Sequence, residues 1–321
     1  MAKLSPEDTL VHRIIQRFPA FRESGVRLAA GDDAALWHAR PGHETILTSD
    51  WFLEGSHFLR DLHPVDSIGW KCLGRAASDI AAMGGTPRCF LLNLALPASC
   101  TNSWMNRFLS GLRQAARFLR CELAGGDTTR NEQIQICVTV IGEVEKGRAV
   151  LRSGAQPNDL LFVSGTLGLA EVGLRQLKKR VRGKSPALRK HLYPEPRIAL
   201  GRWLAKNGFA SAMMDISDGL STDLARMCAA SGVGAVVIEG ALPGPVGVPN
   251  TEATRLALDG GDDYELLFAV PPSRARRLRK NFQGLPITYI GTTTKKRKLL
   301  LANESGRATD LLPQGWDPFR E

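Results

Sequence analysis

The chain has 321 residues, and its 42 Lys and Arg against 32 Asp and Glu give a formal net charge of +10. Hydrophobic residues make up 43% and charged residues 23%, which is typical of soluble globular proteins and argues against a disordered chain. No segment approaches the ~18 apolar residues of a transmembrane helix, and residues 1–8 lack the apolar stretch of a secretory signal. We therefore expect a cytoplasmic, non-membrane protein of roughly two domains.

The cysteine spacing matches neither a zinc site nor a disulfide framework, so we expect reduced thiols in the core. The six positions are Cys72, Cys89, Cys100, Cys121, Cys137 and Cys228. Much of the positive charge lies in three runs, at residues 178–184, 274–280 and 295–298. These runs favour solvated loops and helix faces, because no run interleaves the aromatic side chains that single-strand nucleic-acid binders use for stacking.

In the first half, Ser5 is placed to cap a helix whose first turn contains Pro6 and two acidic residues. Hydrophobic patterning then predicts five further elements. They are a strand at 45–49 that ends in Asp50, a helix at 65–83, a strand at 88–96, a helix at about 102–120 and a strand at about 134–144.

A polar, glycine-containing connection at 145–148 predicts a boundary between domains at 1–145 and 146–321. The second half alternates short apolar strands with helices, so both halves are predicted to be mixed α/β layers. Its predicted elements are a strand at 160–164, a helix at 168–179, a basic linker, a helix at about 195–206, a strand at 211–217, a helix at 219–231, a strand at 234–238, a proline-rich loop at 240–250, and strands at 265–270 and 286–291 that flank a basic helix.

Carboxylates gather beside glycine or serine at the ends of these apolar segments. The clusters contain Asp32, Asp33, Asp50, Asp79, Asp127, Asp215, Asp218, Asp262 and Asp263. A carboxylate this close to a core is costly to bury unless it is paired or binds a metal. Mg²⁺ takes hard oxygen ligands and usually comes with substrate phosphates, and neighbouring glycines let backbone N–H groups approach a phosphate. The pattern therefore indicates a magnesium and phosphate site.

Single motifs also have structural explanations. Ser217 or Asp218 could simply cap the helix that begins at Gly219, and Asp79 could pair with Arg75 one turn earlier. The Gly-Lys-Ser at 183–185 lacks the first glycine of a P-loop, and the glycines at 232–234 lack the third of a dinucleotide fingerprint. No Gly-x-Ser-x-Gly nucleophile elbow is present.

Seven motifs occur in a fixed order, and together they resemble the thiamine-monophosphate kinase family, within the superfamily of aminoimidazole ribonucleotide synthetase and selenophosphate synthetase. The motifs are Gly-Asp-Asp-Ala-Ala at 31–35, Thr-Ser-Asp at 48–50 with Glu-Gly-Ser-His-Phe at 54–58, Ser-Asp-Ile-Ala-Ala-Met-Gly at 78–84, Gly-Gly-Asp-Thr-Thr at 125–129, Arg-Ser-Gly-Ala at 152–155, Asp-Ile-Ser-Asp-Gly-Leu at 215–220 and Gly-Gly-Asp-Asp-Tyr-Glu-Leu at 260–266. The resemblance runs from about residue 7 to the segment 315–319.

This resemblance implies a two-domain α/β fold with an N-terminal ATP- and Mg²⁺-binding domain and a C-terminal domain that completes the active site. It also implies a homodimer in which N-terminal sheets pair, with the nucleotide near the interface, and transfer of a phosphoryl group from ATP to thiamine monophosphate. Carried over by motif, the ligands of several Mg²⁺ ions fall on Asp33, Thr48, Ser49, Asp50, Asp79, Asp127, Asp215 and Asp218. ATP contacts fall on Gly126, Asp127, Arg152 and Ser217, and substrate contacts fall on His57, Asp262 and Trp316.

Three positions depart from the family pattern. Ser49 stands where the family usually has Thr, Asp262 where it usually has Glu, and Asn131 where it usually has Gly. Ser49 keeps the hydroxyl ligand, whereas the shorter arm of Asp262 could weaken a contact to the thiamine moiety. None of the three removes a metal ligand, so we expect activity to survive.

The expected mechanism is electrostatic. A phosphate monoester is already ionised near neutral pH, so no strong general base is needed. Mg²⁺ held by Asp50, Asp127 and Asp218, taken as the catalytic carboxylates, would bridge the two anions and align in-line attack. Two alternatives stay open: a sister enzyme with another acceptor, and a basic nucleic-acid-binding protein with a vestigial metal site.

Overall fold

The computed structural model describes residues 5–181, 183 and 185–320, so Arg182 and Lys184 of the first basic run lie outside the described residues. The chain divides into two compact units. Unit 1 comprises Met1–Ile80 and Gly85–Gly147, and unit 2 comprises Ala81–Gly84 and Arg148–Glu321. Within the described part of the chain, no helix has the length and apolarity needed to cross a membrane.

The predicted N-terminal cap of unit 1 is confirmed. Ser5 Oγ accepts the Asp8 N–H at 3.0 Å, and Asp8 Oδ2 accepts the Ser5 N–H at 3.2 Å, which together make a capping box. The helices of unit 1 are α1 (Pro6–Ile15), α2 (Val65–Ala82, whose last two residues fall in unit 2) and α3 (Ser103–Leu119), with a 3₁₀ turn, η1 (Ala98–Cys100). Its strands are β1 (Val26–Leu28), β2 (Leu36–Trp37), β3 (His43–Leu53), β4 (Thr86–Leu96), β5 (Glu122–Arg130) and β6 (Gln135–Glu145).

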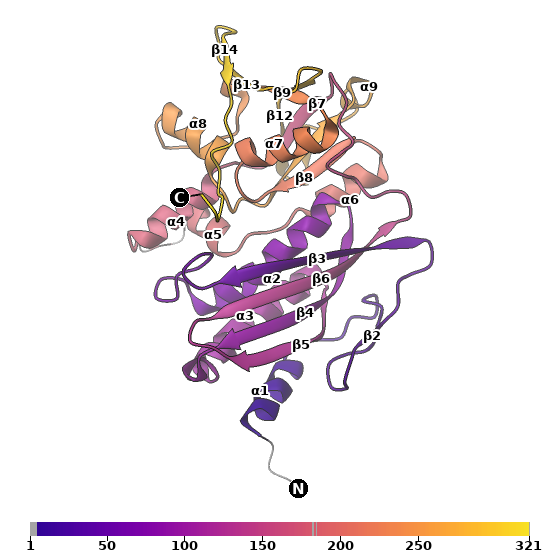
Figure 1. Ribbon diagram of the computed structural model, residues 1–321, viewed down its shortest axis with the longest axis vertical. Helices are drawn as coiled ribbons and strands as arrows, with labels where there is room; N and C mark the ends of the chain where they lie inside the picture. The colour runs from indigo at the N-terminus through magenta and orange to yellow at the C-terminus, as the bar shows by residue number, and fades with distance from the viewer. Residues whose placement is uncertain (1–4, 182, 184, 321) are drawn as a thin grey trace. The chain divides into compact units, whose positions relative to one another are not determined.

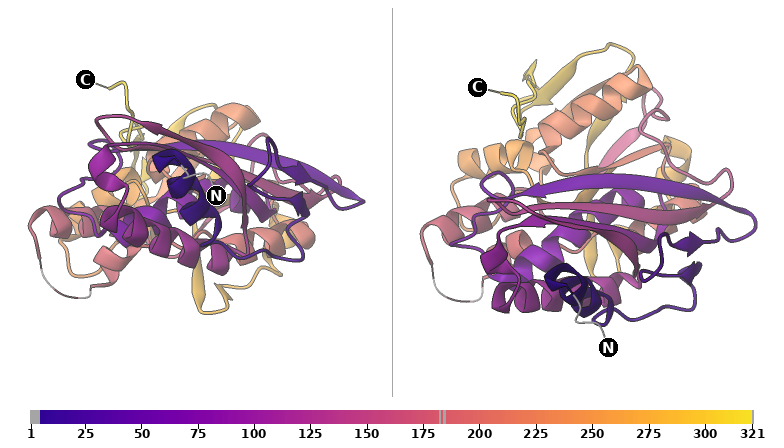
Figure 2. Two further views of the ribbon diagram at one scale, coloured as in Figure 1. Left: turned by 90° about the horizontal axis from the view of Figure 1, so that it is seen from below. Right: turned by 60° about the horizontal axis from the view of Figure 1, so that its bottom comes forward.

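Four long strands form one sheet in the order β3-β6-β4-β5, with only β4 and β5 parallel (Figure 1). Helices α2 and α3 lie along one face of this sheet, as Figures 1 and 2 both show. The two helices can approach closely because Gly69 and Gly111 leave room for backbone: a Cβ on Gly111 would sit 1.8 Å from the Asp66 carbonyl oxygen. The opposite face exposes apolar side chains of β3, with Leu47 69% and Trp51 56% exposed.

Two sequence predictions fail in this sheet. Strand β3 does not end at Asp50 but continues to Leu53, because β6 pairs with it along its whole length from His43↔Glu145 to Leu53↔Gln135. Strand β5, which carries Asp127, was not predicted. Gly-Gly-Asp-Thr-Thr is a composition more typical of turns than of strands, and parallel pairing with β4 overrides that local preference.

Unit 2 contains a mixed sheet in the order β14-β13-β9-β12-β7-β10-β8, with β11 paired to β12. The strands are β7 (Leu160–Ser164), β8 (Ala212–Ile216), β9 (Gly234–Ile238), β10 (Glu265–Val270), β11 (Asn281–Phe282), β12 (Leu285–Thr294), β13 (Leu299–Ala302) and β14 (Ala308–Asp310). The helices are α4 (Leu169–Lys178), α5 (Pro186–Leu192), α6 (Ile198–Lys206), α7 (Leu220–Ser231), α8 (Asn250–Asp259) and α9 (Pro272–Ala275), with a 3₁₀ turn, η2 (Glu239–Ala241).

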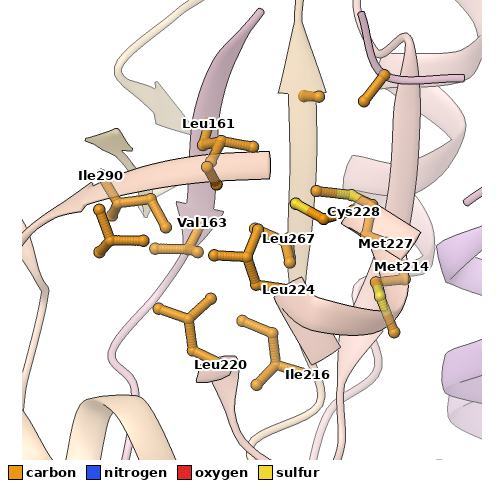
Figure 3. Packing of buried hydrophobic residues seen from close by; sticks show 14 of the residues in the cluster. Leu161, Val163, Met214, Ile216, Leu220, Leu224, Met227, Cys228, Leu267 and Ile290 are labelled. Carbon is orange, nitrogen blue, oxygen red and sulfur yellow. The ribbon is translucent and has the colours of Figure 1, made fainter. Parts of the chain in front are cut away.

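Strand β10 is buried on both faces, which explains its continuous apolar sequence. Leu267 faces a core that includes Leu220 and Leu224 of helix α7, and Leu224 lies beside it (Figure 3). Phe268 faces a second core, which includes Leu200 of α6. Alternate side chains of β10 thus pack into two cores, one on each face of the sheet.

The connection between α4 and α6 is not the plain basic linker that the sequence predicts, because it contains helix α5, capped by Ser185 Oγ on the Leu188 N–H at 3.0 Å. The basic helix predicted between the strands at 265–270 and 286–291 is present only as α9, which spans four residues and is followed by turns. Two cations of the basic runs stabilise turns: Arg274 donates to the Gly208 carbonyl at 2.5 Å and Arg297 to the Gly232 carbonyl at 3.2 Å. The predicted burial of the cysteines is confirmed, since all six are free and buried.

Candidate active site

In unit 1, two predicted metal ligands face helix α2 from strand β3. The Thr48 hydroxyl donates a hydrogen bond to Asp79 Oδ2, and Asp50 Oδ2 lies 3.4 Å from Arg75 Nε. Thr48 and Asp50 are two residues apart on a strand, and Arg75 and Asp79 are four apart on a helix, so each pair presents one face to the other. Asp79 is therefore held by β3, and Arg75 bonds Asp50 across the same layer.

Ser49 lies between these residues and its side chain points to the opposite face of the sheet. Its hydroxyl is 2.9 Å from the Thr139 hydroxyl and 3.4 Å from Cys137 Sγ, both on β6. The structure thus separates the side chain of Ser49 from those of Thr48 and Asp50, because consecutive strand residues alternate between faces.

Asp127 is exposed on β5, at the far edge of the sheet from β3. The strand registers align Trp51 with Cys137, Cys137 with Asn93, and Asn93 with Asp127. Asp127 therefore shares the open face with Ser49 and Trp51, and three strand spacings of ~4.8 Å put it about 14 Å from β3. Within one sheet, the structure does not bring Asp127 to Asp50.

Gly126 and a local hydrogen bond shape the chain around Asp127. Gly126 has φ +149°, and a Cβ there would lie 1.9 Å from the Leu92 carbonyl oxygen, so only glycine fits between β4 and β5. Asp127 Oδ1 accepts the Thr128 N–H at 2.9 Å.

Asp33 is exposed in the loop after β1, and its N–H donates to Asp32 Oδ1 at 2.8 Å.

His57 lies in the turn that follows β3. The ring Nδ1 of His57 accepts the Leu53 N–H at 3.0 Å, and the backbone N–H of His57 donates to the Leu53 carbonyl at 2.9 Å. Since Nδ1 is the acceptor, the neutral ring carries its proton on Nε2. The ring also lies 5.9 Å from the ring of Phe52. The geometry fixes the orientation of the imidazole from the protein side.

In unit 2, the Ser217–Asp218 loop between β8 and α7 forms backbone hydrogen bonds with two segments that are distant in sequence. The Ser217 carbonyl accepts the Asp262 N–H, and the Asp218 carbonyl accepts the Trp316 N–H, each at 2.7 Å. A Cβ on Gly315 would meet the Asp218 carbonyl oxygen at 2.0 Å, so glycine permits this approach. The structure thereby brings together four residues that the sequence analysis assigned to ATP, metal and substrate.

The N–H groups of the same loop bond to Asp223, which sequence analysis missed. Asp223 Oδ2 accepts the N–H groups of Ser217 and Asp218, both at 3.0 Å, and Arg226 Nη1 donates to Asp223 Oδ1 at 2.8 Å and to Asp218 Oδ2 at 2.5 Å. Burial, and then the neighbouring Asp218, raise the pKa of Asp223 to about 6. The sequence signal for Asp223 was an acidic residue in the first turn of helix α7. Neither Ser217 nor Asp218 caps that helix, because its N-cap residue is Gly219, which has no side chain to cap it.

Two further predicted residues lie in unit 2. Asp215 is buried on β8 opposite Leu266. Arg152 is exposed in a loop whose backbone is fixed: its carbonyl accepts the Ser231 hydroxyl at 2.7 Å, and Ser231 Oγ accepts the Ala155 N–H at 3.1 Å. The guanidinium is therefore presented to solvent from a held backbone.

Glu265, three residues after Asp262, is the shared partner in a buried ionic cluster that sequence analysis also missed. Glu265 is 1% exposed, pairs with Lys190, and accepts Arg197 Nε at 2.8 Å and the Ser164 hydroxyl at 2.5 Å. Burial alone would raise the pKa of this carboxyl, but Lys190 and Arg197 lower it, so Glu265 is ionised. Asp263 is fully buried and accepts the N–H groups of Gly168 and Ala170 at the start of α4.

No group of three or more His, Cys, Asp or Glu side chains among the residues that the structure describes is arranged to hold a metal ion by itself. The donors at the predicted positions are all hydroxyl or carboxylate oxygens, the chemistry that Mg²⁺ takes. Mg²⁺ is commonly bound by one or two carboxylates and completed by substrate phosphates. Pairs such as Thr48 with Asp79 fit that pattern of ligation.

Comparison with known proteins identifies the family. The N-terminal domain model of AIR synthase related proteins matches residues 31–144, and the C-terminal domain model matches residues 156–301. The thiamine-monophosphate kinase of Bacillus subtilis is 34% identical over 98% of this chain and 99% of its own length, and that of Escherichia coli K12 is 34% identical over 98% of both. The chain belongs to the thiamine-monophosphate kinase family.

Solved structures agree with this family. The crystal structure of thiamine-monophosphate kinase from Stenotrophomonas maltophilia has a TM-score of 0.82 at 34% identity and covers 94% of this chain and 96% of its own. AaThiL complexed with AMPPCP and TMP has a TM-score of 0.77 at 34% identity and covers 90% and 91%. The hydrogenase maturation protein HypE in complex with ATP shares only the fold, with 19% identity at a TM-score of 0.77 over 96% and 95%. The mixed α/β fold predicted from sequence is confirmed.

Proposed function

We propose that this protein transfers the γ-phosphoryl group of ATP to the phosphate of thiamine monophosphate, giving thiamine diphosphate and ADP. The family to which the chain belongs carries this proposal, together with one observation of geometry. The Ser217–Asp218 loop connects the predicted ATP contact Ser217 directly to the predicted substrate contacts Asp262 and Trp316. A shared loop of this kind can hold donor and acceptor in fixed relation.

The metal assignments follow from the same motifs. Asp33, Thr48, Ser49, Asp50, Asp79, Asp127, Asp215 and Asp218 are the residues that we propose to hold Mg²⁺. When bound, Mg²⁺ neutralises the phosphate oxygens of both substrates and the charge that develops during transfer. Asp50, Asp127 and Asp218 are proposed as the carboxylates on which turnover depends most.

The protein groups then supply position and charge. The attacking oxygen of the acceptor phosphate is already ionised at neutral pH, so no side chain has to remove a proton from it. That oxygen forms a bond to the γ-phosphorus while the bond to the β–γ bridging oxygen breaks, and ADP leaves. Gly126 and Arg152 would contact the nucleotide, Arg152 as a planar donor to a phosphate, and His57 would orient the acceptor.

We also propose that the active protein is a homodimer in which the open faces of the unit 1 sheets pair. Leu47 and Trp51 expose apolar surface on this face, which a second copy would cover. Asp127 and Ser49 lie on the same face but at opposite ends of the strand order. A second copy packed against this face would allow one chain's Asp127 to approach the other chain's Ser49. Unit 1 would thus bind ATP and Mg²⁺ and dimerise, while unit 2 would complete the site.

A cytoplasmic location is part of the proposal. The six free, buried thiols suit a reducing compartment, where disulfides are rare.

The decisive experiment is a coupled ADP-release assay with ATP and Mg²⁺, with and without thiamine monophosphate, followed by identification of the product. ADP release that depends on the acceptor, with thiamine diphosphate formed, is expected. ADP release without acceptor dependence would refute the acceptor and favour a sister enzyme of the same superfamily.

Variants test the residue roles in the same assay. Asp50→Asn and Asp127→Asn are expected to keep the wild-type melting temperature and lose most of kcat, because each removes a ligand charge without changing side-chain size. Asp310→Asn, at an exposed position of β14, is the matched control and should leave kcat unchanged. Wild-type kcat in either site variant at modest Mg²⁺ would remove that residue from the metal site.

A further inference from the structure

The carboxylate of Asp262 lies between two protein side chains, those of Tyr264 and His191. The Tyr264 hydroxyl donates to Asp262 Oδ1 at 2.7 Å, and His191 Nδ1 lies 3.8 Å from Asp262 Oδ2. The Asp262 side chain is 32% exposed, whereas that of His191 is only 2% exposed. The protein therefore approaches the carboxylate from the buried side and leaves part of it open to solvent.

The backbone at this point is fixed in an uncommon conformation. Asp262 has φ +67° and Tyr264 has φ +50°, and neither is glycine. Their N–H groups donate to the carbonyls of Ser217 and Ile216 at 2.7 and 2.8 Å, which ties both residues to the end of β8. A strained conformation that the surrounding structure stabilises in this way is a common feature of functional sites.

The position of His191 is also determined by its neighbours. His191 lies on α5, and the preceding residue, Lys190, forms an ion pair with Glu265, which is buried at the start of β10. Because Glu265 is ionised and also bonds Arg197, this end of α5 is attached to the strand that begins three residues after Asp262. The chain therefore places His191 and Tyr264 on opposite oxygens of one carboxylate through two separate anchors.

We propose that Tyr264 and His191 are positioning residues that hold the Asp262 carboxylate toward the organic, hydrogen-bond-donating end of the acceptor and so set its affinity. This inference rests on the proposed function. The Tyr264 hydroxyl bonds one carboxylate oxygen and His191 lies 3.8 Å from the other, so the exposed part of the carboxylate keeps one orientation. Trp316 is 48% exposed, and its backbone N–H bonds the carbonyl of Asp218, the residue after the Ser217 to which Asp262 is bonded, so one loop holds the backbone of both an exposed indole and the carboxylate. A cationic heteroaromatic group suits that pair.

The Tyr264 hydroxyl is the group that fixes the orientation of the Asp262 carboxylate. Loss of the tyrosine hydroxyl should therefore affect the acceptor and leave the nucleotide unaffected.

The test compares Tyr264→Phe with Tyr289→Phe, an exposed tyrosine whose hydroxyl lies 2.9 Å from Thr292 Oγ1 on β12. Tyr264→Phe is expected to raise KM for thiamine monophosphate roughly tenfold, the effect of losing a hydrogen bond to a charged group, with KM for ATP and kcat unchanged. Tyr289→Phe should change none of these values. His191→Gln is a second, independent variant and should act in the same direction.

A double-variant comparison separates positioning from general support of the fold. In an Asp262→Ala background, adding Tyr264→Phe should produce no further rise in KM, because the group it positions is gone. An equal further rise would overturn the proposal, as would an unchanged KM in both single variants or a parallel rise in KM for ATP. If the wild-type protein transfers no phosphoryl group to thiamine monophosphate, the proposed function itself fails, an outcome that is visible before any variant is made.

Discussion

Replacing Gly126 by alanine should damage both stability and nucleotide binding, whereas the same change at the adjacent Gly125 should not. A Cβ at Gly126 would lie 1.9 Å from the Leu92 carbonyl oxygen, about 1.5 Å short of the 3.4 Å at which ordinary contact begins. Strands β4 and β5 would have to separate there. At Gly125 the nearest atom to a new Cβ is Leu91 Cδ2, the end of a flexible side chain, at 3.4 Å.

The magnitude follows from two costs. Overpacking of this kind costs ~1–3 kcal/mol, and alanine at φ +149° adds strain of ~1–3 kcal/mol. The sum of about 2–6 kcal/mol corresponds to a fall in melting temperature of roughly 5–20 °C for a domain of this size. Gly125→Ala should stay within ~1 kcal/mol of the wild type, since its effect on the unfolded chain is small.

Thermal unfolding of both variants, with and without ATP and Mg²⁺, is the measurement. The nucleotide should raise the melting temperature of the wild type and of Gly125→Ala, and much less that of Gly126→Ala. Equal melting temperatures for the two variants would refute the packing argument. A destabilised Gly126→Ala that keeps the wild-type KM for ATP would instead show that Gly126 is structural only.

Three further outcomes are expected. Trp51→Asp should convert the proposed dimer to a monomer in size-exclusion chromatography with light scattering, while Leu36→Asp, at an apolar position on β2 with 60% exposure, should not. Burial raises the pKa of the Cys89 and Cys228 thiols to about 12, so native protein should react with a thiol reagent far more slowly than unfolded protein. Burial, opposed by Lys190, raises the pKa of Asp263 to about 7 from an unfolded value of 3.8. The contribution of Asp263 to the free energy of unfolding therefore falls as pH rises from about 4 to about 7. In chemical unfolding, the loss of unfolding free energy in Asp263→Asn relative to wild type should be largest near pH 4 and smaller at pH 8.

Local signals predicted many elements correctly. The cap at Ser5, the long helix α2 and the buried strand β10 follow from capping chemistry and hydrophobic patterning over a few residues. Helix α5 was missed because its seven-residue sequence is short and basic, and besides the local cap at Ser185 it is held by Lys190 bonding to Glu265, 75 residues away. Such a partner cannot be recognised within a local window.

The arrangement of the candidate site depends even more on contacts between residues that are far apart in sequence. Motif order located the carboxylates, but strand register decides which of them meet. Thr48 and Asp50 share a face, Ser49 takes the other, and Asp127 lies three strands away, because β6 and β4 are inserted between β3 and β5. That insertion depends on the pairing of segments that are far apart in sequence, and no periodicity reports it.

The burial of β10 on both faces has a consequence for motion. Its amide protons can exchange with solvent only when the surrounding core of unit 2 opens, so they should be among the slowest to exchange in that unit. Asp262 is three residues before this strand and is tied to the neighbouring strand β8, so the carboxylate shares that rigidity on the timescale of turnover. Substitutions that loosen the core of unit 2 should therefore reduce the amount of folded protein before they change acceptor affinity.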